Sequence, residues 1–176
     1  MTGYQVLQEM AADQFGLVTA KEASEAGVGP KALNALARRG RLERRGYGVY
    51  RVLPHVPEEM DRYAEALALV GEGSLVWGES VLAVNGLGLV EPAVVWVRAA
   101  RRCRKKLPSW VRLAKGEGTP RKAVYEGVAC QEAGEAIRSC RGRVMPERLV
   151  AAVREARRKG LLGAREAAAL AKEVRS

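Results

Sequence analysis

The chain has 176 residues, of which 48% are hydrophobic and 5% aromatic, so its core must consist mainly of leucine, valine and alanine. Thirty lysines and arginines against 20 acidic residues give a net charge of +10, which favours a polyanionic partner. No apolar run is long enough to span a membrane, and the amphipathic first residues do not resemble a signal peptide. Three cysteines without C-x-x-C spacing and a single histidine argue against a disulfide framework, a metal site or a cofactor. They favour a cytoplasmic protein with reduced thiols.

The first 53 residues predict a winged helix-turn-helix domain. Thr19 and Glu22 have the spacing of a capping box at the start of a helix, and Gly27 and Gly29 break that helix. Pro30 suits the first turn of the next helix, which Gly40 ends. The predicted elements are a helix over 4–13, a strand over 15–18, helices over 20–26 and 31–39, and a hairpin of strands 42–45 and 49–53.

Charge changes sign where the second helix of this pair begins. Residues 1–30 contain one basic residue and four acids, whereas residues 31–51 contain seven basic residues and one acid, Glu43. Such segregation is typical of a nucleic-acid-binding face, although an arginine-rich hairpin can also be a merely solvated edge. We expect the helix over 31–39 to enter the major groove of DNA. The candidate DNA-contacting residues are Lys21, Lys31, Asn34, Arg38, Arg39, Arg41, Arg44, Arg45 and Tyr47.

Two stretches of this domain resemble the N-terminal winged helix of AbiEi-type antitoxins from type IV toxin–antitoxin (abortive infection) systems. They are the G-x-V-T entry over 16–23 and the R-x-G-x-L-x-R…G-x-Y wing over 38–50, and WGESVLAVNGL over 77–87 resembles a later family helix. The resemblance implies a regulator that represses its own operon by sequence-specific binding to double-stranded DNA. It also implies that the C-terminal domain acts against a nucleotidyltransferase-like toxin.

Two prolines within 54–57 predict a linker, in which His55, the only histidine, is expected to be exposed. Residues 58–176 are expected to form a mixed α/β domain, which makes the chain an α+β protein of two domains. The elements predicted there are helices over 58–70 and 78–85, strands over 93–99, 110–115 and 122–130, and helices over 132–139, 146–159 and 164–174. Gly127 is a candidate break in the strand over 122–130.

A second basic segment lies within this domain. Residues 98–122 contain ten basic residues and one acid, Glu117. This second basic patch, which could contact DNA or a partner or only solvent, consists of Arg101, Arg102, Arg104, Lys105 and Lys106.

Two other functions compete with the specific repressor. The first is a winged-helix protein that binds nucleic acid without sequence preference. The second and weaker one is a metal-dependent nuclease whose carboxylates would be Glu117, Glu126 and Glu132, which lack an accompanying aspartate. Residues 116–122 do not form a phosphate-binding loop, and the lone histidine disfavours a Ser-His or Cys-His pair. The sequence therefore predicts a binding protein rather than an enzyme.

Overall fold

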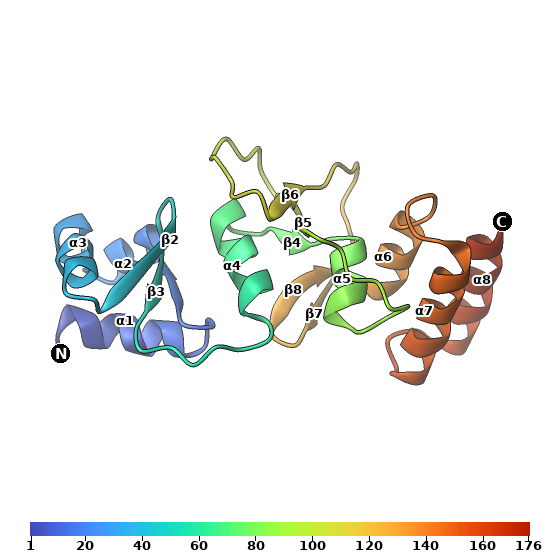
Figure 1. The fold of residues 1–176 in the computed structure, drawn as a ribbon, viewed down its shortest axis with the longest axis horizontal. Helices are drawn as coiled ribbons and strands as arrows, with labels where there is room; N and C mark the ends of the chain where they lie inside the picture. Colours follow the sequence, from blue (N-terminus) through green and yellow to red (C-terminus); the bar gives the residue numbers. More distant parts are fainter. The chain divides into compact units, whose positions relative to one another are not determined.

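The structure, a computed structural model, describes all residues from 1 to 176 and divides into two units (Figure 1). The first unit contains residues 1–72 together with 103–107, and the second contains residues 73–102 and 108–176. None of the helices combines the length and the apolar character that a bilayer crossing would require.

The first unit contains a winged helix. Its three-stranded antiparallel sheet has the order β1-β3-β2. The elements are α1 (Gly3–Ala12), β1 (Leu17–Thr19), α2 (Ala20–Glu25), α3 (Pro30–Arg38), β2 (Leu42–Gly46), β3 (Val49–Val52) and α4 (Asp61–Val70). The core between the helices and the sheet includes Leu7, Val18, Leu33, Leu42 and Tyr50.

The local signals at the helix ends act as the sequence predicts. Thr19 caps α2 by accepting the Glu22 N–H at 3.1 Å, and the Glu22 carboxylate accepts the Thr19 N–H at 2.8 Å. Pro30 occupies the first turn of α3, and Gly40 follows that helix with a positive φ of 72°. The strand expected over 15–18 begins only at Leu17, because Phe15 is half-buried in a turn with φ of 55°.

The expected boundary at 54–57 does not coincide with the division in the structure, because α4 belongs to the first unit. Three contacts link α4 and the segment before it to the winged helix. Glu65 of α4 pairs with Arg45 and Arg51 of the hairpin. His55 is not exposed as expected: its Nε2 lies 2.8 Å from Asp61 Oδ2, and its ring packs against Gly16.

The third contact, between Leu69 of α4 and Gly46 of the wing, explains why position 46 is a glycine. Gly46 does not adopt a positive φ, unlike Gly48 at 66° on the other side of Tyr47. A Cβ at position 46 would instead lie 2.3 Å from Leu69 Cδ2 of α4. The glycine therefore lets α4 approach the wing closely.

The second unit has a five-stranded mixed sheet of order β6-β5-β4-β8-β7. β4 pairs antiparallel with β5 and parallel with β8. The segment over 122–130 forms two strands joined at Glu126 and the candidate break Gly127, whereas β4 was not predicted. The strands are β4 (Leu75–Val76), β5 (Val95–Arg98), β6 (Val111–Leu113), β7 (Lys122–Tyr125) and β8 (Val128–Gln131).

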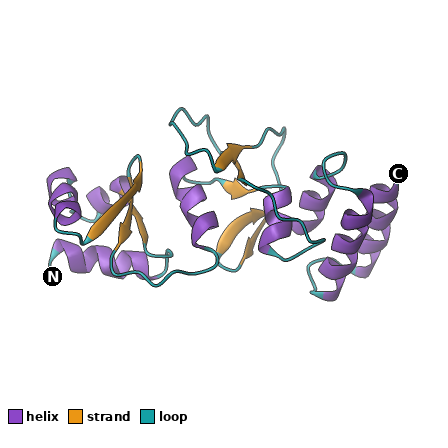
Figure 2. Cartoon of the chain, viewed as in Figure 1, coloured by secondary structure: helices purple, strands orange, loops and turns teal.

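The helices of this unit agree with the sequence prediction, and α7 and α8 lie side by side (Figure 2). They are α5 (Glu79–Val84), α6 (Ala133–Ser139), α7 (Pro146–Arg158) and α8 (Ala164–Arg175). Two buried polar side chains join α5 to the sheet. Ser80 Oγ accepts the Trp96 N–H at 2.8 Å, and the Gln131 side-chain oxygen accepts the Gly78 N–H at 2.9 Å.

Candidate nucleic-acid interface

The outer face of α3 is polar and free of ion pairs. Leu33 is buried and Leu36 and Ala37 are half-buried, which fixes the rotation of the helix about its axis. Lys31, Asn34 and Arg38 are all exposed and follow the i, i+3, i+7 spacing that places residues on one helical face. This face can offer two cationic donors and one amide to a ligand.

The wing presents a second set of polar groups. β2 and β3 are joined by a turn at Tyr47 and Gly48, and Tyr47 is 73% exposed. Arg44 is also exposed and forms no ion pair. The register of the two strands shifts between Arg44 and Gly46, so Arg45 lies in a β-bulge.

Arg45 is held by two carboxylates. Its Nη1 lies 2.7 Å from Glu43 Oε1, and its Nε and Nη2 lie 2.9 and 3.2 Å from the two oxygens of Glu65. The hydrogen bond from Arg45 to Glu65 is the main cause of a raised pKa at Arg45. Unlike Arg44, Arg45 therefore positions the wing against α4, and it would reach a ligand only by exchanging these partners.

Glu65 also faces a second, more deeply buried arginine. Arg51 Nη2 lies 3.7 Å from Glu65 Oε2, and the side chains of Arg51 and Glu65 are 10% and 6% exposed. Two nitrogens of Arg51 have no hydrogen-bond partner. The pairing of Glu65 with these two arginines was not predicted from the sequence. The signal that could have indicated it is the position of Glu65 beside Ala66 and Leu69, on the apolar face of an amphipathic helix.

The other predicted contacts flank this surface. Arg39 and Arg41 are exposed, and the Arg41 guanidinium lies 5.1 Å from the centroid of the Tyr4 ring. The Tyr4 hydroxyl donates to the Leu53 carbonyl. Lys21 pairs with Glu72 at 3.3 Å, but with 71% and 89% of the two side chains exposed this pair contributes little.

The second basic patch is divided between the two units. Arg101 and Arg102 belong to the second unit, whereas the segment with Arg104, Lys105 and Lys106 belongs to the first. All five side chains are exposed. The expectation of one patch within the C-terminal domain is therefore wrong for three of its members.

The three carboxylates of the nuclease alternative do not form a cluster suited to a metal ion. Glu117 is in a loop and Glu126 is in the turn between β7 and β8. Glu132 caps α6 by accepting the N–H groups of Gly134 and Glu135, and it lies 3.6 Å from Arg121. The position of Glu132 is thus accounted for by helix capping.

The three cysteines are unpaired. Burial raises the pKa of both Cys130 and Cys140 to about 12. These two thiols are therefore protonated and poorly nucleophilic at neutral pH.

Comparison with known families gives one match. Residues 5–53 match a family model described as "Transcriptional regulator, AbiEi antitoxin", whereas no curated protein matches the chain. The match begins within α1 and ends just after β3, so it includes α3 and the wing and contains no part of the second unit. The N-terminal winged-helix domain is therefore similar to the AbiEi antitoxin family of transcriptional regulators, in agreement with the resemblance seen in the sequence.

Proposed function

We propose that the chain is a sequence-specific repressor that binds double-stranded DNA at its own promoter through α3 and the wing. The observation that carries the proposal is the outer face of α3, where Lys31, Asn34 and Arg38 are exposed and engage no carboxylate. An α-helix with its side chains is about 10–12 Å across, which fits the width of a major groove, about 12 Å. The nine residues of α3 can therefore lie in the groove.

Each of these side chains has a suitable acceptor in the groove. The amide of Asn34 can bind adenine through N6 and N7, and the guanidinium of Arg38 can bind guanine through O6 and N7. Lys31, at the start of the helix, can contact a base edge or a phosphate. Because Leu33 is buried on the opposite side of α3, it would set which face of the helix is turned toward the DNA.

The wing and its neighbours would contact the backbone. Arg44 and Tyr47 are placed for a phosphate or the minor groove, with Arg39, Arg41 and Lys21 as flanking phosphate contacts. In this proposal Arg45 braces the hairpin and contributes less direct contact than Arg44. The contrast rests on the two carboxylates that hold Arg45.

The test is a titration of the full chain with DNA from its own promoter, followed by fluorescence anisotropy with an excess of unrelated duplex. Asn34→Ala should lose about 1–3 kcal/mol of discrimination at one base pair, because it removes a bidentate contact. Arg44→Ala should weaken all sequences about equally, because a phosphate contact carries no base information. Arg154→Ala, an exposed arginine of α7 in the second unit, is the matched control and should bind as the wild type does.

Two outcomes would contradict the model. Equal affinity for promoter and unrelated DNA would favour the alternative of a non-specific nucleic-acid-binding protein. Unchanged affinity in both variants would remove α3 and the wing from the interface.

The second basic patch would extend the phosphate contacts. Neutralising Arg104, Lys105 and Lys106 should reduce the slope of log K against log salt by about 0.9 for each phosphate that these side chains bind in the wild type. Arg101 and Arg102 are neutralised in a separate variant, because they belong to the other unit. Equal slopes in the wild type and both variants would leave these side chains to a partner or to solvent.

The AbiEi-type domain also supports a proposal for the role of the whole chain, as the antitoxin of a type IV system. The partner would then be a nucleotidyltransferase-like toxin encoded beside it. Co-expression tests this directly, since the chain should restore growth to cells that produce the toxin. Restored growth by Asn34→Ala, which is impaired in DNA binding, would separate antitoxicity from repression.

A further inference from the structure

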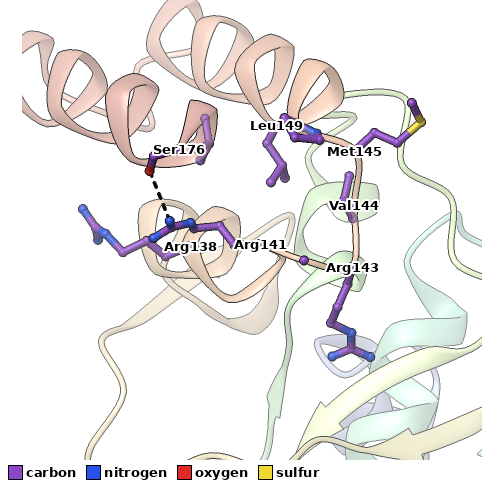
Figure 3. Close-up of a pocket in the computed structure, with 10 residues that line it drawn as sticks. Arg138, Arg141, Arg143, Val144, Met145, Leu149 and Ser176 are labelled. Atoms are coloured by element: carbon purple, nitrogen blue, oxygen red, sulfur yellow. Dashed lines mark hydrogen bonds between the residues drawn. The ribbon is translucent and has the colours of Figure 1, made fainter.

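A cavity in the second unit combines positive charge with an apolar floor. Its volume is about 740 Å³, within the range of about 300–1,000 Å³ that is usual for ligand sites. It lies between the end of α6, the start of α7 and the end of α8 (Figure 3). The lining residues that matter most are Arg138, Arg141, Arg143, Val144, Met145 and Leu149.

The three arginines differ in how firmly they are held. Arg138 forms two hydrogen bonds to Glu173, the shorter at 2.7 Å, and is therefore occupied. Arg141 donates to Ser176 Oγ at 3.3 Å, the hydrogen bond dashed in Figure 3. The hydrogen bond from Arg138 lowers the pKa of Glu173, and the charge of Arg141 also helps to lower it. An exposed guanidinium whose only direct hydrogen bond is to a hydroxyl can still bind a further carboxylate.

Arg143 lies in the segment that joins α6 to α7. Its Nε is 3.4 Å from Glu79, but its side chain remains 49% exposed. The guanidinium stacks on the Trp96 ring at 4.6 Å from the centroid, which fixes its plane. Arg143 is thus oriented by an aromatic surface and only loosely neutralised.

Figure 3 shows the Arg141 and Arg143 side chains pointing away from each other, and the lining residues near them include apolar ones. Leu149 is 1% exposed and Val144 is half-buried, whereas Met145 is 64% exposed. An exposed methionine beside a buried leucine offers an adaptable apolar contact. Arginine and methionine are both enriched at protein–protein interfaces. A phosphate backbone would use the arginines but gain little from the methionine and leucine.

We propose that this cavity binds a short acidic segment of a partner protein. An aliphatic or aromatic side chain of that segment would pack on Met145 and Leu149, and its carboxylates would pair with Arg141 and Arg143. The inference goes beyond the proposed DNA binding, because every lining residue belongs to the second unit.

The chain offers a local probe for this site. It contains four methionines, of which Met1, Met10 and Met60 lie in the first unit and only Met145 lies in the second. We therefore suggest methyl NMR of the full chain labelled at methionine. The ligands are short peptides with one central leucine, phenylalanine or tryptophan flanked by aspartates. Addition of at least one of them should shift the Met145 methyl resonance saturably and leave the other three unchanged.

Variants and altered peptides then test the two parts of the proposal. Arg141→Glu should weaken peptide binding by roughly tenfold or more, equivalent to about 1.4 kcal/mol. Arg154→Glu makes the same charge change elsewhere on the second unit and should have little effect. A peptide with serine in place of its central apolar residue should not shift Met145.

The proposal is overturned if no apolar-centred peptide shifts Met145, or if the serine peptide binds equally well. It is also overturned if a short DNA duplex shifts Met145 and Arg141→Glu abolishes that shift, since the site would then bind nucleic acid. The comparison of peptides uses the wild type alone and does not depend on the folding of any variant. Promoter binding is measured on the same samples, so failure here is distinguishable from failure of the DNA-binding model.

Discussion

Glu65 offers the sharpest test of how α4 is attached to the winged helix. The change Glu65→Gln keeps the shape of the side chain and removes its charge. It removes the ion pair of Arg51, whose side chain is only 10% exposed, and leaves that arginine only the weaker electrostatic interaction with Asp61. Arg45 keeps Glu43 and is one-third exposed, so its charge remains solvated and adds less to the cost.

The burial of Arg51 determines how much stability Glu65→Gln should lose. Removing one partner of a buried pair typically costs about 3–5 kcal/mol, because an uncompensated charge stays buried. Since only one of the two arginines is buried, we expect a loss of about 3 kcal/mol in the free energy of unfolding of the first unit. Glu72→Gln is the matched control: it breaks the exposed pair with Lys21, and its cost should lie within about 0–1 kcal/mol.

The two units can be followed separately in one urea titration of the full chain. Trp77, Trp96 and Trp110 all lie in the second unit, and Met10 and Met60 lie in the first. Tryptophan fluorescence therefore reports unfolding of the second unit, and the two methyl resonances report the first. Glu65→Gln should move only the methyl transition to lower urea.

A double replacement tests whether the buried charge of Arg51 causes the loss of stability. Arg51→Met combined with Glu65→Leu exchanges the buried pair for apolar side chains and should recover most of the lost stability. Equal losses in Glu65→Gln and Glu72→Gln would refute the reasoning. So would a shift of the tryptophan transition as large as that of the methyl transition.

Two further perturbations test other contacts. Gly88→Ala should destabilise the second unit by about 2–3 kcal/mol, measured by tryptophan fluorescence, because φ is 65° and the new Cβ would lie 2.6 Å from the Arg148 carbonyl oxygen. At Asp61, burial alone would raise the pKa, but hydrogen bonds from the Glu58 N–H and His55 lower it below its usual range. The stability that this carboxylate contributes is present above an unfolded pKa of about 4 and is lost as pH falls through the folded value. Wild type and Asp61→Asn should therefore differ in urea stability near about pH 6 and converge near about pH 2, and a constant difference would contradict this origin.

The winged helix was predictable because its signals are local. Thr19 with Glu22 marks the start of one helix, Pro30 marks the next, and the spacing of Leu33, Leu36 and Ala37 indicates the buried side of α3. Because the buried side of α3 is known, the remaining positions, which include Asn34 and Arg38, are predicted to be exposed. The helices of the second unit were found from the same kinds of signal.

The errors arose where distant residues decide the structure. In the sequence, Gly46 resembles a glycine required by a turn. In the structure, a glycine is needed there because a Cβ would clash with Leu69. Arg45 was indistinguishable from Arg44 in sequence, and only the contact with Glu65, 20 residues later, separates their roles. β4 has two residues, too few to show an alternating pattern.

The attachment of α4 also limits how the protein can be dissected. The family match ends at residue 53, which makes a fragment of that length an obvious choice for expression. Such a fragment would lack Glu65 and Leu69, so Arg51 would lose its pair with Glu65 and the side of Gly46 that Leu69 covers would be open to water. We expect that piece to aggregate or to be cleaved rapidly by proteases. A boundary after residue 72 retains α4 but still omits residues 103–107, which return to the first unit from the middle of the second.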